Sequence, residues 1–182
     1  MKKTNIPSQK LLLEDQKKGI GWYAVNVASI IFCIKNNQLN VLLEKRKLPP
    51  EKNKWIIPGK FLNYDSSPEQ TAQAKLQEVL GKRHSYIEQL YLFGDPEREL
   101  GKRVVTSTYM LLVAETNLKQ NYKTSKQSPL ENNWFPVKDL PELAFDTKEI
   151  IKYGIDRLKS KAEYTTIVLG LLPQKFSLTQ LQ

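Results

Sequence analysis

Residues 58 to 82, PGKFLNYDSSPEQTAQAKLQEVLGK, carry acidic and basic side chains at helical spacings. Lys75 and Glu78 are three positions apart, so their side chains are neighbours on one helix face. Carboxylates gathered on such a face can hold Mg²⁺, a hard cation that prefers oxygen ligands. Lysines can instead bind phosphate oxygens directly. The spacing is that of a site built from helix carboxylates, yet almost every position that should be acidic in such a site is not.

The helix that positions these groups has clear start and stop signals. Ser67 is a favourable N-cap, Pro68 fits the first turn, and Gln70 completes a capping box with Ser67. Gly81 predicts a left-handed stop. One apolar stripe joins Ala72, Leu76, Val79 and Leu80. We expect a helix over residues 68–80 that buries this stripe.

Strand patterns surround the predicted helix. Two aliphatic runs joined at Asn36 and Asn37 predict a hairpin that is partly buried on both faces. A second capped helix is predicted from Asp146, with Ile151, Ile155 and Leu158 on one face. Other strands are expected in KWIIPGKFL, YIEQLYLFGD, RVVTSTYMLLVAE and NNWFP. This order predicts the α/β class, with a mixed central sheet covered by helices.

Composition and charge narrow the class of protein. The 182 residues suit a single domain with a small appendage, and the net charge of +9 favours a polyanionic partner, although a solvated lysine-rich surface explains it equally well. The apolar runs are too short for a membrane span, and no secretory signal is visible. Cys33 lies in an apolar run as a buried thiol, and His84 lacks zinc-ligand neighbours. We expect a cytoplasmic protein with no membrane partner.

The loop, the capped helix and the final glycine resemble the Nudix box, G-x5-E-x7-R-E-U-x-E-E-x-G-U, in which U is aliphatic. In that family, glutamates of the helix hold Mg²⁺ against a nucleoside diphosphate. Here Leu76, Glu78 and Gly81 match the pattern, and the other key positions hold Lys60, Ser66, Ala74, Lys75 and Val79. The resemblance implies a degenerate box. We therefore expect no Mg²⁺ site, no other cofactor or metal, no catalytic residues, and pyrophosphate hydrolysis that is lost or vestigial.

Residues 23–182 together resemble the Nudix-related transcriptional regulators of NAD metabolism. Segments that carry this resemblance include YLFGDPERELGKRVVTSTYMLLV and EYTTIVLGLLPQKFSLTQLQ. It implies a Nudix-like α/β/α sandwich that senses ADP-ribose or a related nucleotide. It also implies DNA as a partner through a winged helix absent from this chain, and a homodimer. The expected organisation is an N-terminal extension (1–20), the Nudix-like domain (21–160) and a C-terminal helix or linker (161–182). The segment LLPQKFSLTQLQ in the last part resembles the link into that winged helix and its first turn.

Six residues are the candidates for ligand binding within this resemblance. Lys60 and Lys75, together with Arg46 and Arg103, can bind phosphates in place of a metal, although solvated surface charges are the simpler explanation of all four. Phe61 can stack on a base, although strand aromatics more often belong to the core. Glu78 completes the set, but it can equally be a helix-surface carboxylate paired with Lys75 or Lys82.

Two alternatives to a sensing domain remain open. The first is an active Nudix pyrophosphohydrolase with an atypical site, in which Glu78 acts with Glu97 or Glu115. The second is a structural or partner-binding Nudix-like domain whose pocket is filled by its own side chains.

Overall fold

The computed structural model describes residues 17–18, 21, 23–35, 37–81, 87–99, 103–114 and 131–162. Expectations about the N-terminal helix, His84, Lys82, Glu115, the loop at 116–130 and the segment at 163–182 lie outside the described residues. The predicted boundaries of the three parts of the chain stay predictions.

The described strands form one mixed sheet in which β1 is central. β1 pairs antiparallel with β2 through the predicted hairpin and parallel with β6, while β5 lies beyond β6 at the edge. β3 and β7 pair with β2, and β4 pairs with β1. The strands are β1 (Ala24–Lys35), β2 (Gln38–Lys45), β3 (Trp55–Ile56), β4 (Gly59–Phe61), β5 (Glu88–Phe93), β6 (Val104–Val113) and β7 (Asn132–Pro136).

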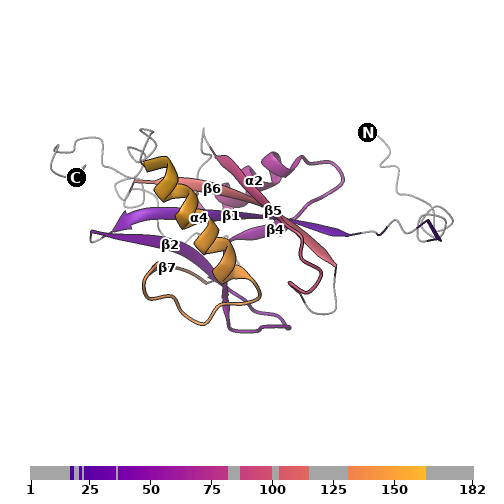
Figure 1. The fold of residues 1–182 in the computed structure, drawn as a ribbon, viewed down its shortest axis with the longest axis horizontal. Helices are drawn as coiled ribbons and strands as arrows, with labels where there is room; N and C mark the ends of the chain where they lie inside the picture. Colours follow the sequence, from indigo (N-terminus) through magenta and orange to yellow (C-terminus); the bar gives the residue numbers. More distant parts are fainter. Residues whose placement is uncertain are drawn as a thin grey trace.

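The two long helices of the described chain, α2 (Pro68–Leu80) and α4 (Thr147–Ala162), cover opposite faces of this sheet (Figure 1). Because side chains alternate along a strand, β1 sends Ile30 and Phe32 toward α4, where they pack with Ile151. Its Ile31 and Cys33 lie in the other core, with Leu76, Val79 and Leu80 of the apolar stripe of α2. Helices therefore cover both faces of the sheet, as in the predicted α/β/α sandwich. Because β1 and β2 are buried on both faces, apolar residues alternate only loosely in their sequences.

Helix α2 has the predicted ends. The hydroxyl of Ser67 accepts a hydrogen bond from the Gln70 N–H at 3.1 Å, and the Gln70 side chain accepts one from the Ser67 N–H at 2.8 Å. Gly81 ends the helix with a φ of 74°, a conformation that favours glycine. The predicted apolar stripe is buried, but so is Lys75, on which the site depends.

The other helix and the single cysteine also agree with the sequence patterns. In α4, Ile151 and Leu158 are buried and Ile155 packs against the same core. Cys33 is fully buried. No helix in the described part of the chain is long and apolar enough to cross a membrane.

Candidate functional site

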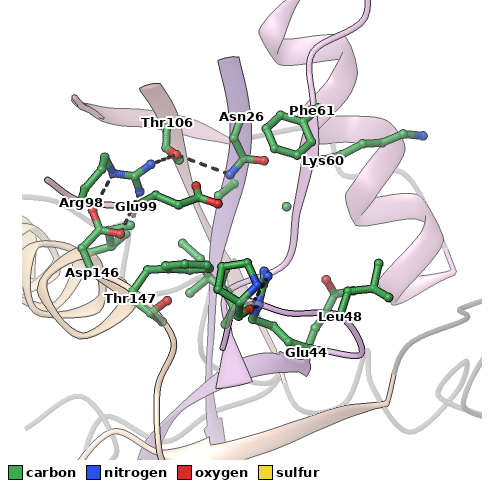
Figure 2. Close-up of a pocket in the computed structure, with 18 of the residues that line it drawn as sticks. Asn26, Glu44, Leu48, Lys60, Phe61, Arg98, Glu99, Thr106, Asp146 and Thr147 are labelled. Carbon is green, nitrogen blue, oxygen red and sulfur yellow. Dashed lines mark hydrogen bonds and ion pairs between the residues drawn. The ribbon is translucent and has the colours of Figure 1, made fainter. Parts of the chain in front are cut away.

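An open cleft of about 600 Å³ lies where β1, β4 and β6 meet the loop after β2 and the start of α4 (Figure 2). Ala28, Ile56, Ile57 and Ile150 give it an apolar floor. Its charged lining consists of Glu44, Lys45, Arg46, Lys47, Lys60, Arg98, Glu99 and Asp146. Because basic groups outnumber acidic ones in this lining, the cleft suits an anionic ligand.

One end of the cleft is a hydrogen-bonded polar network. Arg98 donates to both carboxylate oxygens of Asp146, each at 2.8 Å, and this bidentate geometry fixes the guanidinium. A third bond runs from Arg98 to the hydroxyl of Thr106 at 2.7 Å, and the Asn26 amide approaches that hydroxyl at 3.5 Å. Figure 2 shows Glu99 beside this network. This end presents fixed donors and acceptors to a ligand.

The other side of the cleft is a rim of exposed side chains from β4 and the loop after β2. Phe61 is 53% exposed, and Lys60 extends away from the Arg98 end in Figure 2. Arg46 lies over the ring of Phe145, with its guanidinium carbon 4.6 Å from the centroid, and donates to the Pro50 carbonyl at 2.9 Å. Gly59 of β4 pairs closely with Ala28 of β1, where a larger side chain would crowd β1. This close pairing places the next two residues, Lys60 and Phe61, on the rim of the cleft.

A second charged group, the buried cluster, consists of Glu44, Lys75 and Glu78. The ammonium of Lys75 is 2.7 Å from Oε1 of Glu44 and 3.1 Å from Oε1 of Glu78. Glu44 is 1% exposed and Lys75 is 4% exposed. Glu44 faces α2 because it follows the inward-facing Leu42 by two positions on β2. The cluster therefore joins the sheet to the helix, and only Glu44 reaches the cleft lining.

The electrostatics of the cluster follow from its burial. Removal from water raises the pKa of the Glu44 carboxyl above its ordinary range, because burial disfavours the charged form. The Lys75 ammonium lowers it in part, and the nearby Glu78 carboxylate raises it. Lys75 is thus the counter-ion that makes a buried Glu44 carboxylate tolerable.

The chemistry of this cluster does not match the needs of a divalent cation. In the described part of the chain, no three carboxylate, histidine or cysteine side chains are grouped as metal ligands. The two carboxylates that α2 and β2 bring together already share an ammonium. A divalent ion beside that ammonium would meet strong like-charge repulsion at such distances.

The structure places the six predicted ligand residues in three separate locations. Arg46, Lys60 and Phe61 line the cleft. Lys75 and Glu78 belong to the buried cluster, and their predicted pairing is confirmed. Arg103 lies elsewhere, where it donates to the Gly94 carbonyl at 2.7 Å and stacks over Tyr23.

Several residues of the site were not among the predicted ones. Glu44 had a visible signal, since it is an acidic residue at the end of the apolar run NVLLE. Asn26, Arg98 and Asp146 come from three separate segments, and a single sequence does not show that these meet. Glu97, the proposed partner of Glu78 in an active site, lines a different depression, so the structure does not bring these two into one site.

Comparison with protein families matches residues 24–154 to the NUDIX domain. Among curated proteins, the chain is 30% identical over 178 residues to the ADPR responsive transcriptional repressor NtrR of Acinetobacter baylyi, covering 96% of this chain and 70% of the repressor. It is 29% identical over 112 residues to the ADP-ribose pyrophosphatase of Methanocaldococcus jannaschii, covering 62% of this chain and 63% of the enzyme.

Solved structures give a similar result. Shewanella oneidensis NrtR in complex with a 27mer DNA superposes with a TM-score of 0.77 at 31% identity, over 87% of this chain and 72% of that one. The NUDIX domain of the same protein, solved with ADP ribose, gives a TM-score of 0.64 at 29% identity, over 84% of this chain and 99% of that one.

Proposed function

The chain belongs to the Nudix family, and from this premise we propose that its cleft is the sensing site of a transcriptional regulator. The ligand is ADP-ribose or a nucleotide like it, and DNA is the regulator's partner. The relatives support this choice, since one is an ADPR responsive repressor and a solved relative is bound to ADP ribose.

The observation that carries the proposal is the cleft itself. A volume of about 600 Å³ is in the range of small-molecule sites. Arg46 and Lys60 supply positive charge for a diphosphate, and Phe61 supplies an exposed ring on which adenine can stack. The Asn26–Thr106–Arg98 end offers polar groups for a sugar.

We further propose that the cleft binds its ligand without Mg²⁺ and does not hydrolyse it. Hydrolysis of a diphosphate needs a cation to activate water and neutralise the developing charge. In the buried cluster the ammonium of Lys75 takes the carboxylate contacts that such a cation would need. An ammonium balances charge, but it cannot coordinate and acidify a water molecule as a metal does.

Calorimetry with ADP-ribose tests the proposal, in EDTA and again with Mg²⁺. We expect the same dissociation constant in both, with no AMP or ribose 5-phosphate detected by chromatography. Lys60→Met and Phe61→Ala are the cleft variants, and exposed Lys52, outside the cleft lining, provides the matched control Lys52→Met. Absence of binding to ADP-ribose and related dinucleotides at about 100 μM protein, well above typical ligand affinities, would refute the sensing role.

A pyrophosphohydrolase is the second candidate, favoured by the similarity to the ADP-ribose pyrophosphatase. It requires Glu44 and Glu78 to exchange the Lys75 ammonium for a metal when substrate binds. Mg²⁺-dependent release of AMP that disappears in Glu78→Gln would establish this activity and overturn the non-hydrolytic proposal.

A further inference from the structure

The charges of the cleft are divided unequally between its two ends. On the side of the rim, Arg46 and Lys60 belong to the lining, and no described acidic side chain forms an ion pair with either of them. At the polar end, the guanidinium of Arg98 is already neutralised by the carboxylate of Asp146. A ligand therefore meets uncompensated positive charge at the rim and a balanced ion pair at the other end.

The Arg98–Asp146 ion pair is shielded from water, since its side chains are only 7% and 13% exposed. The bonds to Asp146 and Thr106 use three of the five N–H groups of Arg98. Because the pair is buried and its charges compensate each other, the remaining N–H groups suit a neutral oxygen, such as a sugar hydroxyl, better than a second anion.

Glu99 adds one more negative charge to this end of the cleft. It belongs to the lining, and its carboxylate points from the Arg98 side toward Asn26 (Figure 2). Among the described residues, none donates a hydrogen bond to this carboxylate or forms an ion pair with it. A carboxylate is a strong acceptor for hydroxyl groups and repels a phosphate. The polar end therefore has a net negative charge in a cleft whose rim is basic.

We propose that Glu99 is a specificity-determining residue of the cleft, which selects ligands whose sugar end carries hydroxyls and rejects those that carry a further phosphate there. The inference rests on the proposed function, because it takes the sensed ligand to be a nucleoside diphosphate linked to a sugar. The carboxylate of Glu99 accepts hydrogen bonds from the sugar hydroxyls, and the amide of Asn26 and the guanidinium of Arg98 donate to the sugar oxygens.

The same charges give the ligand one direction in the cleft. In the reverse direction, the diphosphate would lie beside the carboxylates of Glu99 and Asp146, and Lys60 would have no anion to bind. With the diphosphate at the rim, the unlike charges attract each other and only neutral hydroxyls approach Glu99.

ADP-ribose 1″-phosphate tests the role of Glu99, because it differs from ADP-ribose by one phosphate on the terminal sugar. For the wild-type chain we expect its dissociation constant, measured by calorimetry in EDTA, to be about tenfold higher than that of ADP-ribose. In Glu99→Gln, which keeps the shape of the side chain and removes its charge, this ratio should fall to about twofold. ADP, which lacks the terminal sugar, should bind both proteins equally.

Glu97→Gln is the matched control, because Glu97 is exposed in the same segment but lines the neighbouring depression and not the cleft. It changes the net charge of the chain by the same amount, so the ratio should stay at its wild-type value.

Three outcomes would overturn the role of Glu99 while ADP-ribose binding itself stands. The ratio could be the same in the wild type and Glu99→Gln, it could fall equally in Glu97→Gln, or Glu99→Gln could weaken ADP as much as ADP-ribose, which would indicate a general structural effect. A wild-type chain that binds none of the three ligands would instead refute the sensing site on which the role of Glu99 depends.

Discussion

Lys60 and Lys75 come from the same stretch of sequence, but they lie in two very different regions of the molecule. Lys60 is exposed on the rim of the cleft, and no described residue forms an ion pair with it. Lys75 is buried between Glu44 and Glu78. One cation is available to a ligand, whereas the other is already used inside the protein.

This difference shows that burial, and not residue type, decides what a charge can do. A lysine on the rim stays hydrated until a phosphate displaces its water, so removal of this lysine affects ligand binding. A buried lysine compensates a carboxylate that is excluded from water, so removal of this lysine lowers the stability of the fold. The cluster and the rim should therefore respond to similar substitutions in opposite ways.

The largest expected effect is that of Lys75→Met on stability. Removal of one partner of a buried ion pair leaves the other uncompensated, and we expect the free energy of unfolding to fall by about 3 kcal/mol. Lys60→Met removes the same charge from the rim and should change stability by less than about 0.5 kcal/mol. Urea unfolding followed by circular dichroism measures both.

The double variant Lys75→Met with Glu44→Gln identifies the cause. It removes the unpaired carboxylate together with the ammonium, so most of the lost stability should return. If the double variant is as unstable as Lys75→Met, then packing of the lysine stem, and not charge, supports the cluster.

Lys75→Glu should turn the buried cluster into a divalent cation site. The substitution places a third carboxylate beside Glu44 and Glu78, which suits the oxygen preference of Mg²⁺. We expect a protein that is destabilised in EDTA and regains about 2.7 kcal/mol when Mg²⁺ reaches 100 times its dissociation constant. Thermal unfolding with and without Mg²⁺ measures this effect, and the wild-type chain should show none.

The cleft rim should affect ligand affinity with little change in stability. Phe61→Ala removes a stacking ring, and Lys60→Met removes a phosphate contact, so each should weaken ADP-ribose binding about tenfold, or about 1.4 kcal/mol. Calorimetry measures the affinity, with Lys52→Met as control. Equal affinity in Phe61→Ala would place the base elsewhere in the cleft.

The sequence predicted those features that depend on neighbours along the chain. The Ser67–Gln70 capping box, the Gly81 stop and the apolar stripe of α2 are local, so their residues could be identified before any fold was known. The alternating burial of β1 followed from the period of a strand.

The site was less predictable because its contacts join distant segments. Arg98 meets Asp146 across 48 positions, and Lys75 meets Glu44 from a different element. Helical spacing correctly paired Lys75 with Glu78, but it could not show that Lys75 is buried. Lys75 was grouped with Lys60 as a ligand residue because charge type is visible in a sequence and solvent exposure is not.

The smallest expected effect concerns the pH dependence of the buried cluster. Burial raises the pKa of the Glu44 carboxyl above its ordinary value of 4.5, so the folded chain binds this proton more tightly than the unfolded chain does. The resulting stabilisation is complete below pH 4.5 and is lost as the pH rises through the folded-state pKa. Glu44→Gln does not titrate, so its stability relative to the wild type should increase from about pH 4 to pH 7.

Urea unfolding at a series of pH values measures this difference. The effect is small because the Lys75 ammonium offsets part of the effect of burial on the pKa of the Glu44 carboxyl. A relative stability of Glu44→Gln that falls with rising pH would mean that the ion pair with Lys75 outweighs desolvation. The charges of the buried cluster would then stabilise the fold. Lys75 in the cluster and Lys60 on the rim would differ only in their exposure to solvent.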